Sequence, residues 1–471
     1  MQVTETLNEG LKRKLNVVIP KSDLTGRLEA RLGELRSQAN IKGFRPGKVP
    51  AGHLKKIYGK SAMAEVMQDA INSTVGDALT SRSERAAAQP KVDLPEDQGT
   101  LNRVLDGESD LNFDVSYEVL PAVELMNFSG LALEHPVVPI TDEDVEKELG
   151  RVFRGNRGYE PKPDDGVVAE GDNLGLSFVG RIDGKTFEGG SSDHSHLVVG
   201  SGDFVPGFEE QLVGMKKGDS KAVTITFPAD YSREELRGKT AVFDVTILHI
   251  DAPQAGVELN DDFARRLGLD DLNALRGSIR EQLTTALEAM SRQAVKRQIL
   301  DRLDEGHKFQ VPEQLVDAEF DSIWERVKHE IEEHGRSFED EGTTEAEARE
   351  QYRKIAERRV RLGLVVAEIG NTNKVEVTED EHQQALIAEV RRFPGQEQQV
   401  YDYYRKNPQA LAGLRAPVFE NKVVDFIAAQ AVMTDIPMTR EELGKRIQDE
   451  GEDVPDEHHH DHDDHAGHDH G

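Results

Sequence analysis

The 471-residue sequence contains no cysteine, and it has no run approaching the roughly 20 apolar residues that a membrane-spanning helix needs. The absence of cysteine excludes disulfides, thiolate metal sites and cysteine nucleophiles, and it suits a reducing compartment. The N-terminal stretch MQVTETLNEGLKRKL has no apolar segment before a small-residue cleavage site, so we expect no export signal. No phosphate-binding loop or dinucleotide fingerprint occurs, so we expect no nucleotide. These absences predict a soluble, cytoplasmic protein.

Apolar residues are also scarce. They make up 37% of the chain and charged residues 31%, whereas roughly 45–50% apolar content is usual for a globular protein. Much of the chain must therefore be surface, which fits elongated helices better than one globule. At roughly 150 residues per domain, the length predicts about three domains.

Charge is unevenly divided along the chain, whose formal net charge is −31. Residues 1–60 hold 13 Lys and Arg against five Asp and Glu, and the other residues hold 45 Lys and Arg against 84 Asp and Glu. The basic end can approach a polyanion that repels the acidic body. This excludes a general nucleic-acid binder and is typical of a protein that docks on a nucleic-acid-rich particle through one tip.

Hydrophobic periodicity predicts a small α+β domain over residues 1–120. Alternation indicates strands over 11–19 and 111–119, and leucines at helical spacing indicate a helix over 22–38. The stretch GFRPGKVP at 43–50 has two Gly and two Pro, so it must be a loop. A second helix is predicted over about 52–84.

The next two regions are predicted to be a linker and an antiparallel β domain. The linker covers 121–160 and contains a helix over about 142–152. Residues 161–251 are rich in Gly and β-branched residues, and their strand candidates are 174–178, 223–227 and 242–250.

Residues 252–446 change to helical periodicity. Apolar residues from Leu272 to Leu303 predict a helix of about 30 residues, which Gly306 ends. A capping box, Thr378 with Glu381, begins a later helix. The pattern is consistent both with projecting arms and with an ordinary helical bundle. The expected fold class is thus α+β multidomain, with an antiparallel β domain and an elongated all-α C-terminal domain.

The C-terminal segment 447–471 is acidic and rich in histidine. Its last part, EHHHDHDDHAGHDHG, holds seven of the 16 histidines. Imidazoles and carboxylates at this density can chelate Ni, Cu or Zn weakly, but no fixed ligand spacing is present. We expect a disordered tail, for which a solubilising role is favoured over metal binding.

The basic loop is the first candidate binding site. Between Lys42 and Lys60 there are six cations and no acidic residue. Phe44 and Arg45 lie at the tip of the turn, where positive charges suit phosphate contact and an exposed aromatic ring suits stacking. The same residues also fit a solvated helix–loop–helix whose Phe44 folds back on its own core.

The loop sequence GFRPGKVP resembles the ribosome-docking signature of the bacterial trigger factor family, Gly-Phe-Arg-x-Gly-x-x-Pro. The variable position, often Lys in the family, is Pro46 here, which removes one positive charge and stiffens the tip. The domain order agrees with the family over about residues 1–440. The resemblance implies a ribosome-binding site at Gly43, Phe44, Arg45, Pro46, Gly47 and Lys48.

Three blocks of the β domain resemble prolyl isomerases of the FK506-binding-protein (FKBP) type over about 75 residues. They are LSFVGRIDGKTFEGG, GSGDFVPGFEEQLVGMKKGD and FPADYSREELRGKTAVFDVTIL. The resemblance implies a proline-binding pocket with catalytic positions at Phe178, Phe187, Glu188, Phe204, Val205, Phe208, Tyr231 and Phe243. Glu188 replaces the family's Asp, Phe208 its usual Trp and Phe178 a Tyr. The alternative is that these aromatic side chains form no binding pocket and only fill the core of a small β-barrel.

The trigger factor resemblance implies an ATP-independent chaperone. Such a protein docks on protein and rRNA near the exit tunnel of the large ribosomal subunit, holds nascent and unfolded polypeptides, and isomerises X–Pro bonds. It implies no cofactor, no metal and no membrane, and it allows a weak homodimer when the protein is free. A rival interpretation is a holdase whose FKBP-like domain binds peptides without catalysis. A third, a metal-handling protein, depends only on the tail.

Overall fold

The computed structural model describes residues 2–38, 44, 49–228, 231, 233, 236–333, 337–338 and 343–449, apart from the side chains of Ser37, Gln38, Ala51, Glu188 and Asp449. The chain divides into two compact units. The first contains the residues up to His135, Gln293–Asp435 and those from Arg446, and the second contains Pro136–Arg292 and Ile436–Lys445. An N-terminal α+β region, an antiparallel β domain and a helical C-terminal region are present, so the predicted fold class is confirmed.

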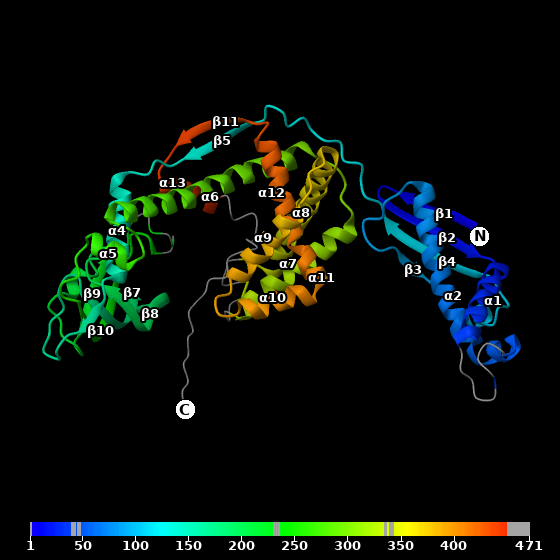
Figure 1. The fold of residues 1–471 in the computed structure, drawn as a ribbon, viewed down its shortest axis with the longest axis horizontal. Helices are drawn as coiled ribbons and strands as arrows, with labels where there is room; N and C mark the ends of the chain where they lie inside the picture. Colours follow the sequence, from blue (N-terminus) through cyan, green and yellow to red (C-terminus); the bar gives the residue numbers. More distant parts are fainter. Residues whose placement is uncertain are drawn as a thin grey trace. The chain divides into compact units, whose positions relative to one another are not determined.

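The N-terminal region of the first unit, blue in Figure 1, is a four-stranded sheet packed with helices. Its strand order is β1-β2-β4-β3, and all pairs are antiparallel. The elements are β1 (Gln2–Glu9), β2 (Lys12–Ile19), α1 (Lys21–Gln38), α2 (Ala51–Arg82), β3 (Lys91–Asp93), α3 (Gln98–Leu105) and β4 (Leu111–Glu118).

Sequence periodicity located α1, α2 and the two central strands of this region, because each buries an apolar face, whereas α3 was not predicted. Alternate residues of β2 and β4, such as Val17 and Phe113, lie in the same core as Leu28 of α1 and Met63 of α2. Strand β1 was not predicted. Its side chains are exposed on both faces except for the half-buried Leu7, so no alternation marks it in the sequence.

The β domain lies in the second unit and is drawn in green tones in Figure 1. Its sheet has the order β6-β10-β7-β8, and β9 pairs with β10 on the other side. The strands are β6 (Tyr159–Pro161), β7 (Asn173–Ile182), β8 (Lys185–Val198), β9 (Ser220–Thr226) and β10 (Thr240–Pro253), and a 3-10 helix, η1, covers Glu210–Leu212. Three of these strands were predicted. The long β8 was not, because its GGSSDHSH run lacks apolar alternation.

Three helices of the second unit share a core around Leu149, Phe263 and Ile279. They are α4 (Asp142–Asn156), α5 (Asp261–Arg266) and the first part of α6 (Leu272–Gly306). Helix α6 begins and ends as the sequence predicted. Helix α4 begins at a capping box in which Thr141 and Asp144 exchange hydrogen bonds, which satisfies otherwise unpaired N–H groups.

The remaining helices follow α6 along the chain. They are α7 (Glu313–Glu333), α8 (Glu345–Asn373), α9 (Glu379–Arg391), α10 (Glu397–Lys406), α11 (Pro408–Gly413) and α12 (Arg415–Ala428), followed by α13 (Arg440–Asp449). Helices α7, α8 and α12 contribute to two apolar clusters of the first unit, one of them centred on Trp324, whereas α13 as far as Lys445 belongs to the second unit. The predicted capping box at Thr378 and Glu381 is confirmed at the start of α9. No helix within the described ranges is both long and apolar enough to cross a membrane.

One strand interrupts the region for which the sequence predicted helices alone. Strand β11 (Val432–Pro437) pairs with β5 (Ala132–Val137), which lies in the expected linker. The backbone N–H of Val432 donates to the Leu131 carbonyl oxygen at 2.9 Å. Most side chains of β11 are exposed, so its hydrogen bonds come from a partner 300 positions away in the chain, and helical periodicity could not reveal it.

Candidate functional site

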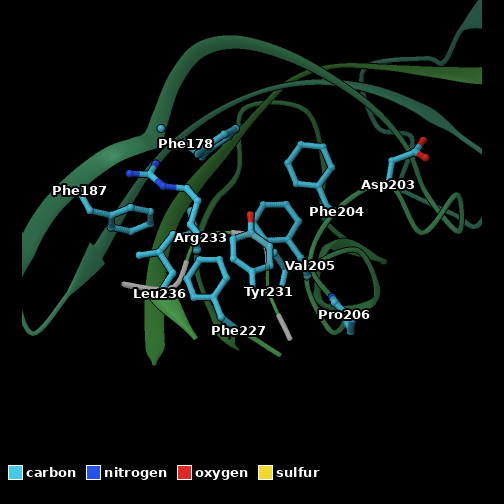
Figure 2. Close-up of a pocket in the computed structure, with 13 residues that line it drawn as sticks. Phe178, Phe187, Asp203, Phe204, Val205, Pro206, Phe227, Tyr231, Arg233 and Leu236 are labelled. Carbon is cyan, nitrogen blue, oxygen red and sulfur yellow. The ribbon is translucent and has the colours of Figure 1, made fainter. Parts of the chain in front are cut away.

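An aromatic cavity of about 360 Å³ opens in the β domain. Side chains from three strands and two connecting segments line it, as Figure 2 shows. The lining residues are Phe178, Phe187, Gly189, Asp203, Phe204, Val205, Pro206, Phe208, Phe227, Tyr231, Arg233, Leu236 and Phe243. A volume of this size lies within the range of small-ligand pockets.

The floor and walls of the cavity are aromatic rings that contact one another either edge to face or stacked. Phe208 is 2% exposed, and its ring stacks on Phe204 with centroids 5.0 Å apart. Phe178 meets Phe243 edge to face at 5.8 Å, and Phe243 meets Phe187 at 6.0 Å. Such contacts fix the ring orientations, so the cavity walls are held before any ligand arrives.

Glycine at position 180 lets the sheet accept one of these rings. A Cβ added at Gly180 would stand 2.5 Å from Cε1 of Phe243 and 2.9 Å from the Gly190 carbonyl oxygen. Real Cβ atoms do not approach other atoms so closely, so only glycine leaves room for the ring over β7. The ring of Phe243, on β10, therefore lies close against Gly180 of β7 and forms one side of the cavity.

Glu209 holds the segment that carries Phe204. Its side chain is 6% exposed and accepts backbone hydrogen bonds from Gly200 at 2.7 Å, Gly202 at 3.3 Å and Phe204 at 3.2 Å. The Ser201 hydroxyl donates to the same carboxylate at 3.3 Å. A buried carboxylate is stable only when its oxygens are satisfied, so this group and the turn around it stabilise each other.

The chemistry available in the cavity is that of an apolar binding surface. Two charged residues, Asp203 and Arg233, lie on opposite sides of the opening in Figure 2. None of the described lining residues is a Ser, Cys, His or Lys that could act as a nucleophile. The arrangement suits a reaction that needs shape and a low dielectric rather than a covalent intermediate.

The expected pocket residues lie together, with one exception. Phe178, Phe187, Phe204, Val205, Phe208, Tyr231 and Phe243 all line the cavity. Glu188 follows Phe187 in β8, but its side chain lies outside the described residues. Sequence reasoning missed Phe227 and Leu236, which lie in the same FKBP-like block as Tyr231; the run FPADY was the signal that could have identified Phe227.

The basic motif lies where the sequence placed it, between α1, which ends at Gln38, and α2, which begins at Ala51. Phe44 is described, is 37% exposed, and has its ring centroid 5.0 Å from that of His53. The other expected contact residues, Gly43, Arg45, Pro46, Gly47 and Lys48, lie outside the described residues.

Comparisons with known proteins cover nearly the whole chain. The family model for bacterial trigger factor protein matches residues 1–152, the model for the bacterial trigger factor C-terminus matches 271–429, and the model for FKBP-type peptidyl-prolyl cis-trans isomerase matches 165–248. A solved chain from work on the trigger factor chaperone aligns with 91% of this chain and 99% of its own length, at 18% identity and a TM-score of 0.46.

Curated relatives agree with these family models. The trigger factor of Brucella anthropi is 49% identical, covering 95% of this chain and 94% of its own length. That of Methylocella silvestris is 50% identical, covering 94% of this chain and 96% of its own. That of Azorhizobium caulinodans is 48% identical, covering 94% of this chain and 98% of its own. The chain belongs to the trigger factor family.

Proposed function

We propose that the cavity lined by Phe178, Phe204, Phe208, Tyr231 and Phe243 is where X–Pro peptide bonds isomerise. The protein is a ribosome-associated chaperone with a peptidyl-prolyl cis-trans isomerase domain of the FKBP type. The single observation that carries the residue assignment is that seven aligned positions, far apart in sequence, line one cavity.

The physical reason lies in the amide bond. Rotation about C–N has a barrier of about 18–20 kcal/mol because resonance gives the bond partial double-bond character and a large dipole. Twisting removes the resonance and makes the group less dipolar. A largely apolar, aromatic pocket disfavours the planar, dipolar ground state relative to the twisted one, while its shape selects the proline ring. Such differential binding needs no residue that forms a covalent bond.

A proline-peptide assay on the full chain tests the residue assignment. We expect Phe204→Ala and Tyr231→Ala each to lower kcat/KM about tenfold or more, equal to a loss of about 1.4 kcal/mol of transition-state stabilisation. Val242→Ala is the matched control, because Val242 neighbours Phe243 on β10 but is 40% exposed and does not line the cavity. Unchanged turnover in folded cavity variants would remove the assignment.

The protein binds ribosomes and nascent chains as a family member. For the finer site we infer contact of Phe44, Arg45 and Lys48 with protein and rRNA beside the exit tunnel of the large subunit. Its support is the basic stretch 42–60, which is free of acidic residues, and the exposed ring of Phe44. Positive charge at the N-terminal end of an otherwise acidic chain directs that end toward the negatively charged rRNA of the ribosome.

Co-sedimentation with empty ribosomes tests the docking site. The triple variant Phe44→Ala, Arg45→Ala and Lys48→Ala should reduce binding strongly at modest salt. A matched control removes one exposed aromatic ring and two exposed cations from α10, namely Tyr403, Arg405 and Lys406. Equal sedimentation of both triple variants would contradict the proposed site.

We extend the proposal to the chain's organisation. Residues 1–120 would bind the ribosome, and 121–160 would link this domain to the next. Residues 161–251 would isomerise X–Pro bonds, 252–446 would hold unfolded polypeptides, and an acidic tail would begin at 447. We place the protein in the cytoplasm, where ribosomes work, and allow a weak homodimer off the ribosome. Deletion of 252–446 should abolish suppression of aggregation and leave peptide isomerisation, which needs the β domain alone.

A further inference from the structure

Two histidines meet over a glycine on the β-domain sheet, away from the aromatic cavity. Gly175 in the central strand β7 pairs with His196 of β8 on one side and with His249 of β10 on the other. The two imidazole rings have centroids 5.5 Å apart and an interplanar angle of 57°. We call these two residues the cross-strand histidine pair.

The pair lies on the opposite face of the sheet from the cavity. Leu174 and Leu176, on either side of Gly175 in β7, are fully buried in the domain core. Successive side chains of a strand point to opposite faces, so the position of Gly175 belongs to the outer face. His196 is exposed and His249 is half-buried there, which leaves both rings accessible to solvent ions.

Glycine at 175 is what allows the rings to meet. A Cβ at this position would stand 1.9 Å from Cε1 and 2.2 Å from Nδ1 of His249. The His249 ring therefore occupies the space of the missing side chain and leans over the central strand toward β8. A local register shift in β10 between Ile247 and His249 accompanies this placement and re-aims the side chain.

A carboxylate lies beside the pair. Asp251, two residues after His249 on the same strand, has Oδ2 3.7 Å from Nε2 of His249. His194, two residues before His196, is also exposed. The strands thus carry a His-x-His and a His-x-Asp sequence on the two sides of Gly175. Imidazole with carboxylate is a donor set for Zn²⁺, Ni²⁺ and Cu²⁺ rather than for Ca²⁺ or Mg²⁺.

We propose that His196 and His249 bind one divalent transition-metal ion, Zn²⁺ being the probe, on the outer face of the isomerase sheet. Within the part of the chain that the structure describes, no three His, Asp or Glu side chains are already gathered for a metal. The two imidazoles are therefore the primary ligands, and water or a rotated Asp251 carboxylate completes the shell. This site is separate from the histidine-rich tail.

The test must distinguish Zn²⁺ binding by the cross-strand histidine pair from Zn²⁺ binding by the histidine-rich tail. The parent protein is the full-length chain with the seven histidines of 458–470 changed to Gln, so tail binding is removed without truncation. Calorimetric titration with Zn²⁺ should give one equivalent of bound metal. Zn²⁺ should also raise the unfolding temperature, because an ion that binds only the folded state stabilises it.

His196→Gln and His249→Gln, each in this background, should weaken Zn²⁺ binding by about tenfold or more, since loss of even an outer-shell partner costs this much. His329→Gln is the matched control, because His329 is an exposed helical histidine with no ring partner in the described residues. Circular dichroism without metal checks folding, and the exposed position 196 serves if the half-buried 249 variant unfolds. Absence of binding in the parent, or binding as tight as the parent's in either folded variant, would overturn the proposal.

Discussion

The carboxylate of Glu209 accepts a hydrogen bond from the backbone N–H of Gly200 at 2.7 Å, across a turn of nine residues. Two further backbone N–H groups, those of Gly202 and Phe204, bond to the same carboxylate. The shape of one cavity wall therefore depends on a side chain that does not line the cavity. Glu209 is a positioning residue in this sense.

Glu209→Gln should lower isomerase kcat/KM about tenfold, because an amide NH₂ would face backbone donors and lose about 1–2 kcal/mol of the turn's hydrogen bonding. The neighbouring exposed Glu210→Gln serves as the control with the same change of charge. The measurement is the proline-peptide assay, with KM and kcat resolved separately. A parallel loss in both variants would assign the effect to charge rather than to the turn.

Gly180→Ala should damage the cavity without replacing any residue that lines it. The new Cβ would collide with the Phe243 ring and the Gly190 carbonyl, and overpacking of this kind costs about 1–3 kcal/mol of folding free energy. We expect lower stability in urea together with reduced isomerisation. Gly363→Ala, in α8 with open space around it, should instead leave activity unchanged and stabilise its helix by about 0.5–1 kcal/mol.

Glu84 links folding of the N-terminal region to pH. Its carboxylate accepts hydrogen bonds from Arg82 at 2.8 Å, from the Tyr117 hydroxyl at 2.6 Å and from Arg13 at 3.1 Å, and these partners lower the pKa of Glu84 to about 2. A lowered pKa in the folded state means that the stabilisation is complete above the ordinary value of 4.5 and is lost as pH falls toward 2.

Glu84→Gln should therefore lower the free energy of unfolding at pH 7, and the difference from the parent should shrink as the pH is lowered below 4.5. Urea titrations at a series of pH values between 7 and 3 measure this difference. The exposed Glu96→Gln is the control, because it makes the same change of charge at the surface of the same region. A difference that stays constant with pH would contradict the ion-pair assignment.

Thr378 caps helix α9 by accepting the backbone N–H of Glu381 at 3.3 Å. Thr378→Ala should destabilise the protein by about 1 kcal/mol, because a helix N-terminal N–H loses its partner. Thr285→Ala, in the middle of α6, is the control, since its hydroxyl only donates to the Glu281 carbonyl within the helix. Urea unfolding measures both, and equal effects would contradict the capping role.

Local pattern was enough to locate many of the elements. Helix α6 was predicted because apolar residues from Leu272 to Leu303 repeat on one face over its whole length, and α9 because Thr378 and Glu381 have the spacing of a capping box. Strands β1, β8 and β11 were not predicted, since polar or exposed residues fill them, and β11 also pairs with a strand 300 positions away. A strand without apolar alternation carries no local signal.

The sequence by itself determined the division of charge along the chain, the absence of thiol chemistry, the basic Gly- and Pro-rich motif at 43–50 and the aromatic residues of the β domain, since these are properties of residue type and order. Only the tertiary structure decided that the Glu209 carboxylate bonds to the backbone N–H of Phe204 and that Phe227 and Leu236 line the cavity. It also decided that the rings of His196 and His249 meet over Gly175. Such relations depend on strand register and on the space that a glycine leaves. Both are fixed by the packing of segments far apart in the chain.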